Sequence, residues 1–572
     1  MTRTVARLLP FIAMLLGALP TSPLRAQGVS PGVVRDEFRT RPTLPATPPD
    51  KLQAPAAPSL AAGVPAGGRR ILVQRFDIVG NSAIGSDELQ PLVAPYVGQR
   101  LTLLEIYDVA DLITRYYRTH GYTLASAYVP EQQVSSGVIT FEVIEGKLGD
   151  ISTQGLRRTR ERLVRWQMNE LQPGAVVRTV PLEREVLLLN DLPGVDARAV
   201  LQPGKEFGTS DLVLDATEKR YDASIGLNNY GRESIGEWRV QADAALNGML
   251  GIGDQLAFSG VYAEADLMHY GRLAYSLPVS AWGTRAEVYY SSFDYAVDEK
   301  KLGPGFETFD IDGEGDNFGI TVLHPVWRAQ NKNLFLGLGY DRSVTRQTTQ
   351  FVDDGPPDRR NLDMGLAVFT ALFNYTGPDG SFSTLGASLS TNFDRPERRA
   401  DVNPEQSGFD TSLENNAQTA KLQIDLSHYR RLWQQLAGFA RFSAVASPDP
   451  LNDLEQFRIG GPNGVRAYPS SELAGDRGYT ATGELQHPVN MFPGLYNQRL
   501  KAFVDTGRVY RKNHHRLGVE RSESLTGVGV GYQAFAFGHV AVDATLAYPL
   551  GRHEASDDDD GLRFWTGITA NF

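Results

Sequence analysis

The chain ends in the stretch Leu562-Arg563-Phe564-Trp565-Thr566-Gly567-Ile568-Thr569-Ala570-Asn571-Phe572. One face of this stretch holds the apolar positions, and the other holds Arg563, Thr569 and Asn571. Neighbouring side chains in a strand point to opposite faces of a sheet. The two-residue period therefore predicts an amphipathic β-strand, with an apolar face on one side and a polar face on the other.

The same period runs backward through the chain to about Tyr221. Ala286, Val288 and Tyr290 share one face, and so do Leu334, Leu336, Leu338 and Tyr340 and, further on, Val540, Val542, Ala544, Leu546 and Tyr548. At about 22 residues per strand and loop, residues 220–572 hold about 16 strands. A soluble β-sandwich would also alternate, but it does not account for so many strands together with an aromatic last residue. We predict a transmembrane β-barrel of about 16 antiparallel strands.

Short proline-containing turns indicate the orientation of the barrel in the membrane. His324-Pro325-Val326 and His487-Pro488-Val489 each close an even-numbered strand, and proline ends ladder pairing at little cost. We place these turns on the periplasmic side. Longer polar loops are expected on the other side at residues 298–313, 347–360 and 395–408. The longest, residues 447–478, is then the sixth extracellular loop.

Composition narrows the class of protein. Asp and Glu number 67 against 56 Lys and Arg, which gives a net charge of −11. A nucleic-acid binder normally carries a basic face, so no nucleic-acid partner is expected. Cysteine is absent from the sequence, which suits an oxidising compartment and excludes thiolate chemistry. No phosphate-binding loop, hydrolase nucleophile motif or metal-ligand spacing is found. We therefore expect no enzymatic activity, cofactor or metal.

The N-terminal segment has the features of a secretory signal. Arg3 and Arg7 precede an apolar run from Leu8 to Leu19, which is shorter than the roughly 20 residues of a membrane span. We predict a signal peptide over residues 1–26; a buried N-terminal helix is the alternative. Residues 27–70 are rich in proline, which indicates an extended or flexible linker. A short helix at Val33–Phe38 within it is a candidate plug for the pore.

Two small α/β modules are expected between this linker and the barrel, over residues 71–146 and 147–219. In the first, Thr102 and Glu105 form a capping-box pair for a helix, and Ser86 is expected to cap a shorter one. Modules of about 75 residues have thin cores, and we expect each to leave a sheet edge free.

The sixth loop contains Gly460-Gly461-Pro462-Asn463-Gly464-Val465-Arg466-Ala467-Tyr468-Pro469, a Gly/Pro frame around one arginine. On strand 13, Phe503, Asp505 and Gly507 share the inward face. A buried carboxylate needs donors, and a guanidinium offers a planar pair. We predict that the loop folds into the barrel and that Arg466 pairs with Asp505, with Glu484 on strand 12 as a second candidate partner. The alternative is an exposed Arg466 and an Asp505 that only lines water.

These residues resemble a known family, the two-partner secretion transporters (TpsB), which are the haemolysin-secretion and filamentous-haemagglutinin transporter branch of the Omp85 superfamily. The resemblance covers the signal, the linker, two POTRA-like modules and the barrel. It rests on Phe76-x-Ile78-x-Gly80-Asn81, Tyr117, Gly121-Tyr122, Val143-Ile144-Glu145-Gly146, Val465-Arg466-Ala467-Tyr468 and Phe503-x-Asp505-x-Gly507. Ala467 stands where the superfamily pattern has glycine. Since glycine tolerates backbone angles that alanine does not, we expect a different turn there.

The resemblance implies export of a large, β-helix-forming exoprotein across the outer membrane without nucleotide hydrolysis. Periplasmic POTRA domains would receive the client's N-terminal secretion domain. Phe572 would be read by the barrel-assembly machinery, outer-membrane lipid would surround the barrel, and we expect a monomer. Two other functions remain as alternatives. An Omp85-type assembly factor would insert membrane proteins and usually has more POTRA modules, whereas a passive porin has no need of POTRA modules.

Overall fold

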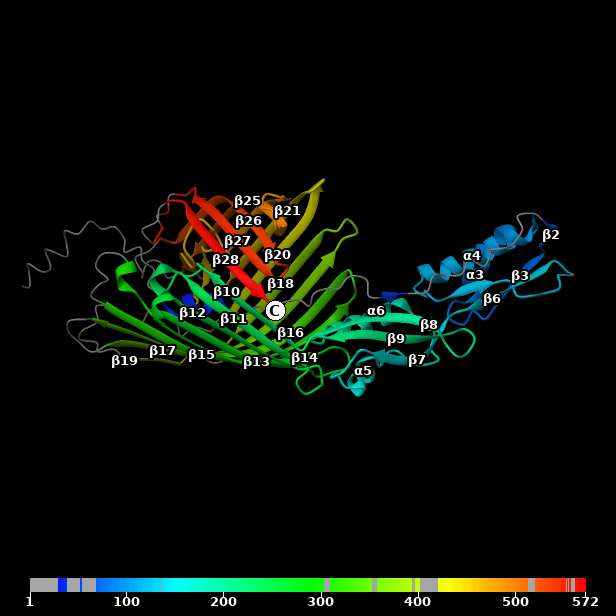
Figure 1. The fold of residues 1–572 in the computed structure, drawn as a ribbon, viewed down its shortest axis with the longest axis horizontal. Helices are drawn as coiled ribbons and strands as arrows, with labels where there is room; N and C mark the ends of the chain where they lie inside the picture. Colours follow the sequence, from blue (N-terminus) through cyan, green and yellow to red (C-terminus); the bar gives the residue numbers. More distant parts are fainter. Residues whose placement is uncertain are drawn as a thin grey trace, which may run out of the picture.

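The computed structural model describes residues 29–38, 52–53, 68–134, 136–302, 309–351, 357–392, 397–401, 420–512, 520–551, 553, 555–556 and 561–572. The predicted signal peptide, residues 1–26, and most of the predicted linker lie outside these residues. The described part forms a barrel with an arm of two small α/β modules at one end (Figure 1).

The barrel is a closed antiparallel sheet, as predicted. The strands counted around its wall are called staves below. Its staves in order are β10 (Tyr221–Asn228), β11 (Arg239–Asn247), β12 (Gln255–Ala263), β13 (Met268–Pro278), β14 (Arg285–Ala296), β15 (Phe309–Arg328), β16 (Lys332–Phe351), β17 (Asp358–Thr376), β18 (Phe382–Thr391) with β19 (Glu397–Asp401), β20 (Ala420–Trp433), β21 (Leu436–Ala446), β24 (Arg477–Pro488), β25 (Leu495–Tyr510), β26 (Ser522–Ala536), β27 (Val540–Pro549) and β28 (Arg563–Asn571). Because β18 and β19 both pair with β17, they form one stave, and the ring has 16 staves.

The outer surface of the barrel matches a lipid environment. Apolar side chains such as Leu338, Val504 and Ile568 are about half exposed on the outward face. A set of exposed aromatic side chains lies at the end that carries the arm: Trp282, Trp327, Trp433, Phe492, Tyr496, Phe537 and Phe572. An apolar band bordered by aromatic residues is typical of outer-membrane barrels.

Three neighbouring staves are longer than the strands predicted from the sequence. β15 and β16 have 20 residues each and β17 has 19, whereas about 9–11 residues span a membrane. The expected loops 298–313 and 347–360 are therefore wrong in part, because β15 begins at Phe309 and β16 continues to Phe351. These extensions were not predicted because their residues are polar. A strand that projects beyond the membrane needs no apolar face. Most of the expected loop 395–408 lies outside the described residues.

The first module packs two helices on a small sheet of β3 (Arg75–Val79), β6 (Val138–Ile144) and β5 (Ser126–Tyr128). The shorter helix is α3 (Ser86–Val93) and the longer is α4 (Leu103–Thr119), while β2 (Ile71–Leu72) pairs with β4 (Arg100–Leu101). The capping box of Thr102 and Glu105 is present. Ser86 begins α3 and does not cap it, since the N-cap is Gly85. Glu145 is buried and accepts hydrogen bonds from Tyr117 Oη at 2.8 Å and Ala83 N at 2.6 Å.

The second module joins the arm to the barrel. Its sheet order is β1 (Leu52–Gln53), β8 (Val195–Pro203), β9 (Thr209–Glu218) and β7 (Lys147–Gln154), with helices α5 (Glu161–Gln167) and α6 (Thr179–Asn190). At the end of α6, Asp191 accepts from Arg328 Nε at 2.9 Å and Nη2 at 2.7 Å. The Arg328 side chain is fully buried. This ion pair fixes the module to the end of β15.

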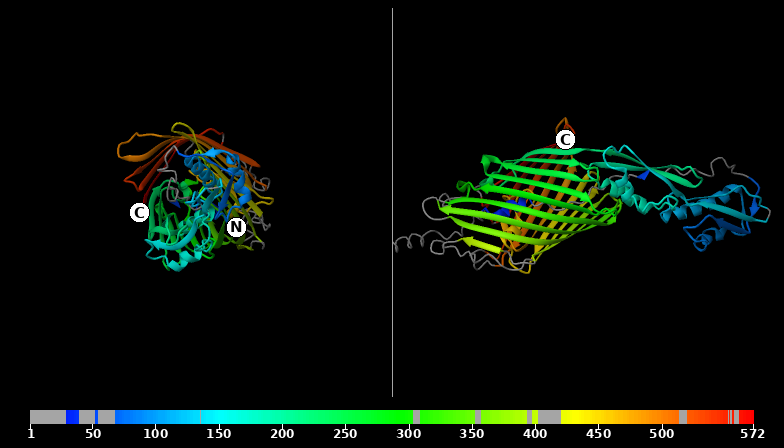
Figure 2. Two further views of the ribbon diagram at one scale, coloured as in Figure 1. Left: turned by 90° about the vertical axis from the view of Figure 1, so that its right-hand side faces the viewer. Right: turned by 90° about the horizontal axis from the view of Figure 1, so that it is seen from below.

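A helix lies inside the barrel. It is α2 (Pro31–Phe38), drawn in blue within the ring of strands in Figures 1 and 2, and it covers the short helix expected at Val33–Phe38. Val33 and Val34 are buried against apolar side chains of β12 to β15, such as Val261 and Phe293. Among the described helices, none has the length and apolar character needed to cross a membrane.

Candidate functional site: loop 6 and the helix in the barrel

The chain between β21 and β24, called loop 6 below, folds back into the barrel. It carries a short ribbon of β22 (Phe457–Ile459) and β23 (Leu473–Gly475). Val465 and Tyr468 are completely buried, together with Phe503 and Leu525 of the barrel wall. Because this loop has an apolar core of its own with the inner wall, its position is fixed by packing as well as by charge.

Arg466 lies at the tip of loop 6 and contacts two carboxylates on the wall. Its Nε and Nη2 donate to the two oxygens of Asp505 at 2.7 and 2.9 Å, and its Nη1 donates to Glu484 Oε2 at 3.0 Å. The backbone N–H of Arg466 also donates to Asp505, at 3.2 Å. The structure therefore brings together the pair expected from sequence and adds Glu484 as a simultaneous partner. The exposed alternative for Arg466 is wrong, because its side chain is only 12% exposed.

The surroundings explain why this pair can be buried. Asp505 has no exposed surface, and Thr482 Oγ1 donates to it at 2.9 Å in addition to the arginine. Gln486 donates to Glu484 at 2.7 Å. The guanidinium carbon of Arg466 lies 3.3 Å from the ring centroid of Phe503, which is a cation–π contact. A buried ion pair is tolerated when its remaining polar atoms are satisfied, and here both carboxylates have further donors.

Ala467 and Gly507 occupy positions with little free space. Ala467 is buried, and it is not among the described residues with a positive φ, so alanine carries no backbone strain at this site. A side chain at Gly507 would come within 3.1 Å of Thr480 and 3.3 Å of Ile459 of loop 6. Gly507 therefore allows β25 to lie close against the loop ribbon, a role that its place in the motif did not reveal.

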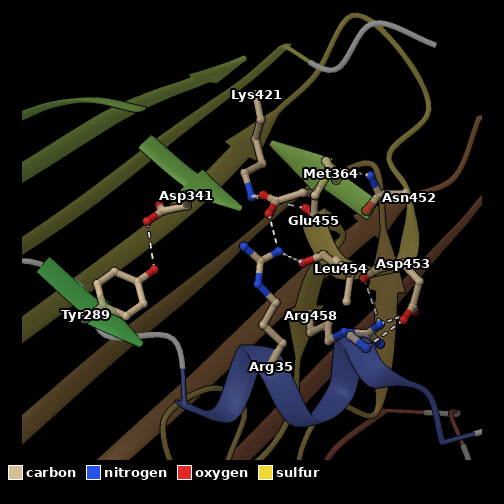
Figure 3. A network of polar contacts seen from close by, with 11 residues as sticks. Arg35, Tyr289, Asp341, Met364, Lys421, Asn452, Asp453, Leu454, Glu455 and Arg458 are labelled. Atoms are coloured by element: carbon tan, nitrogen blue, oxygen red, sulfur yellow. Dashed lines mark hydrogen bonds and ion pairs between the residues drawn. The ribbon is translucent and has the colours of Figure 1, made fainter. Parts of the chain in front are cut away.

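The base of loop 6 contacts helix α2 (Figure 3). Arg35 Nη1 donates to Glu455 at 2.5 Å and to the Leu454 carbonyl at 3.3 Å. The N–H of Gly32 donates to Asp453 Oδ2 at 2.8 Å. A Cβ on Gly32 would lie 2.3 Å from that same carboxylate, so glycine is what lets the helix approach the loop.

Glu455 holds the helix and the wall together. It is almost fully buried and accepts from Arg35 of α2 and from Lys421 of β20. Next to it, Arg458 of β22 donates to Asp453, as Figure 3 shows. Two cations on one buried carboxylate offset the cost of burying the charge. Arg35, Glu455 and Arg458 could not be predicted from the sequence, because single charges in a linker and in a polar loop are ordinary surface features.

The last residue lies where the first strand of the barrel, β10, pairs with the last strand, β28. The backbone N–H of Phe572 donates to the Ala223 carbonyl at 2.8 Å, and Lys219 donates to the Phe572 carbonyl at 3.1 Å. Its side chain is 60% exposed at the end of the barrel that carries the arm. Among the described residues, no group of three His, Asp or Glu side chains is arranged to hold a metal ion.

Family models and curated proteins match most of this chain. The family model for haemolysin secretion/activation protein ShlB/FhaC/HecB matches residues 208–534, and the ShlB-type POTRA domain matches residues 71–146. The chain is 25% identical over 500 residues to the heme/hemopexin transporter protein HuxB of Haemophilus influenzae, covering 86% of this chain and 85% of that protein. It is 23% identical to the hemolysin transporter protein ShlB of Serratia marcescens, covering 89% and 86%.

Solved structures show the same fold. CdiB from Escherichia coli is similar with a TM-score of 0.68 at 22% identity, covering 91% of this chain and 93% of that one. BamA from Haemophilus ducreyi, lacking POTRA domains 1–3, is similar with a TM-score of 0.53 at 16% identity, covering 87% and 100%. The family model covers more than half of the chain, and the chain has an outer-membrane barrel with periplasmic POTRA domains. The chain therefore belongs to the ShlB/FhaC/HecB family of haemolysin secretion/activation proteins, the outer-membrane translocators of two-partner secretion.

Proposed function

We propose that this protein exports one large, β-helix-forming partner exoprotein through its barrel, after its POTRA domains have bound the client's N-terminal secretion domain. The observation that carries the proposal is the lock of Arg466 with Asp505 and Glu484, which holds loop 6 inside a barrel of 16 staves. A barrel of this size is wide enough for an aqueous channel. A secretion channel must be closed at rest, and its plug must be able to leave during export.

Helix α2 is proposed as a second part of the plug. Its apolar face packs on the wall and its polar face is bound to loop 6 through Arg35 and Gly32. Because the two plugs contact each other, displacement of one removes partners of the other. Binding of the client would supply the free energy for this displacement, and no step requires nucleotide hydrolysis.

The POTRA modules offer an edge for an extended client segment. The first module's sheet has β3 and β5 as its outer strands, and the free edge of a sheet can pair with an extended chain. The relatives are named as a heme/hemopexin transporter, a hemolysin transporter and the outer membrane transporter CdiB, so the family is not tied to one cargo. An adhesin, a cytolysin and a contact-dependent toxin all fit the same route.

Deletion of the gene tests the proposal against the alternative of an assembly factor. Export predicts that one large protein disappears from the culture medium while the outer-membrane profile is unchanged. Loss of many outer-membrane proteins would instead support an Omp85-type insertion factor. A matched strain that carries the chain without residues 71–146 should also fail to capture the client in a pull-down; retained capture would place recognition elsewhere.

A further inference from the structure

A short basic stretch of the second module lies beside the barrel. Residues 157–166 hold five arginines against one glutamate, a local net charge of +4, whereas the whole chain carries −11. All five arginines are exposed, and they are called the arginine surface below: Arg157, Arg158, Arg160, Arg162 and Arg165. A basic stretch by itself is an ordinary solvated surface, so the position of this one decides what it can bind.

The first part of this stretch is held in place through its backbone. The side chain of Glu218, at the end of β9, accepts hydrogen bonds from the N–H groups of residues 157–159 at 2.8 to 2.9 Å. The N–H of Arg160 donates to the Gly251 carbonyl, in the turn between β11 and β12, at 3.1 Å. The backbone therefore has a fixed position against the barrel, while the arginine side chains remain exposed.

Helix α5 adds an aromatic side chain to the same surface. Arg162, Arg165 and Trp166 are three and four positions apart, so they share one face of the helix. Val164 and Gln167, on the opposite face, are buried in the module, whereas Trp166 is 40% exposed. An exposed tryptophan beside basic residues is typical of a protein surface at the boundary of a membrane, where the ring lies among the lipid head groups.

The position of α5 places this face at the periplasmic rim of the barrel. A Cβ on Gly253, in the turn between β11 and β12, would lie 3.3 Å from the side chain of Leu163 in α5 and 3.4 Å from Pro278 at the end of β13. Figure 1 shows α5 just beyond the ends of β13 and β14. Three apolar side chains of the neighbouring turns are about half exposed, namely Met249, Leu250 and Trp282. The arginine surface is therefore continuous with an apolar rim that matches a lipid interface.

We propose that the arginine surface and Trp166 bind anionic phospholipid head groups in the periplasmic leaflet of the outer membrane. A guanidinium offers a planar set of donors that matches the oxygens of a phosphate, and each basic side chain near an anionic leaflet strengthens the attraction about fivefold. The site goes beyond export, because it gives the second module a lipid partner in addition to the contact of Asp191 with Arg328. The two attachments together set the angle of the arm to the membrane.

A nitroxide label next to α5 tests the proposal on the full-length protein in lipid nanodiscs. The sequence has no cysteine, so Asn169→Cys gives a single label at an exposed position two residues after the helix. When phosphatidylglycerol is added to phosphatidylcholine discs, access of a neutral nickel chelate to the label should fall about fivefold. High salt should restore access, because it screens the charges. Equal access in the two lipid compositions would overturn the proposal.

Charge removal at two places separates this site from a general charge effect. Arg162→Gln/Arg165→Gln in the labelled protein should remove most of the effect of phosphatidylglycerol. The ion pair of Arg165 with Glu161 is exposed, and such pairs contribute little to stability, so the variant should fold. Arg100→Gln/Arg115→Gln is the matched control, because it removes two exposed arginines from the first module, and it should keep the full effect. An equal loss in both variants would contradict a site at α5.

Two soluble anions separate a lipid from other partners. Inorganic phosphate and polyglutamate, each added to phosphatidylcholine discs, supply negative charge without changing the bilayer, and neither should shield the label at position 169. Shielding by phosphate would show a site for the free anion, and shielding by polyglutamate would assign the surface to an acidic protein segment; either result would overturn the proposal. Trp166→Ser keeps every charge and should still weaken the effect of phosphatidylglycerol, whereas an unchanged effect would reject the part of the proposal that concerns the ring.

Discussion

The methyl group of Ala467 occupies the space that a side chain at position 527 would need. A Cβ on Gly527 of β26 would lie 2.4 Å from the Ala467 Cβ, closer than any van der Waals contact allows. Gly527 therefore makes room for the alanine at the tip of loop 6. The departure from glycine at position 467 is accommodated by a glycine on the opposing wall.

Gly527→Ala should push the loop tip out of its seat. Overpacking of a filled site costs about 1–3 kcal/mol, so loop 6 should become sensitive to protease and export should fall. The second substitution Ala467→Gly in the same chain removes the clashing methyl and should restore both. Gly531→Ala, in the same strand as Gly527, is the control, since the nearest atom to a Cβ there is the Thr545 Oγ1 of β27, 3.3 Å away. Failure of Ala467→Gly to rescue would contradict the pairing of these two residues.

Arg466→Ala should nearly abolish export while the barrel still assembles, and Asp505→Ala should act in the same way. Removal of one partner leaves the other buried without its counter-charge, which typically costs about 3–5 kcal/mol. In a double-mutant cycle the two losses should be far from additive, because the residues contact each other. The cycle is measured from the amount of client in the medium, and heat-modifiable migration in electrophoresis checks that each variant folds. Additive losses would mean that the contact carries no share of the function.

The barrel and the tip of loop 6 could be predicted from sequence because their signals are periodic or concentrated. Alternating residues identify each stave, and a Gly/Pro frame around Arg466 marks a folded loop. The contacts of α2 could not be predicted, because Arg35 and Glu455 are 420 positions apart and neither belongs to a recognisable sequence pattern. The same holds for Trp565: its place in an alternating strand predicts an inward ring, but not the hydrogen bond that its Nε1 donates to the Arg466 carbonyl of loop 6 at 2.7 Å.

The ion pair between Asp191 and Arg328 should hold the second POTRA module at a fixed angle to the barrel. Asp191→Ala leaves a fully buried arginine without its bidentate partner. We expect faster hydrogen exchange in α6 and in the turn after β15, and cleavage by protease at the junction. Asp150→Ala is the matched control in the same module, because the Asp150–Lys205 pair is largely exposed and such pairs contribute little. Equal effects of the two variants would show that the buried pair has no special role.

The stability of the second POTRA module should fall as pH rises. Burial raises the pKa of the Glu185 carboxyl to about 8, and the nearby charge of Glu170 adds to this while Arg184 opposes it. The folded form therefore keeps a proton that the unfolded chain releases near pH 4.5, and stability is lost progressively between about pH 4.5 and 8. Glu185→Gln should flatten this dependence and stabilise the module at pH 7 by up to about 3 kcal/mol. Denaturant unfolding at pH 5 and pH 8, monitored by hydrogen exchange in α6, measures this pH dependence. An unchanged pH slope in Glu185→Gln would assign the effect to another group.

Gly32→Ala should drive α2 out of the barrel. The added Cβ would fall 2.3 Å from the Asp453 carboxylate and 2.4 Å from the Asp453 carbonyl, and the backbone carbonyl has little freedom to yield. Loss of the helix also removes Arg35 from Glu455, which leaves Lys421 as the described cation on that buried carboxylate. We expect a higher single-channel conductance in planar bilayers, since one of the two plugs is gone. Gly85→Ala is the control, because a side chain there meets nothing within 4 Å and lies in the first POTRA module. Wild-type conductance in Gly32→Ala, with the helix shown by cross-linking to have left the barrel, would mean that loop 6 alone closes the pore.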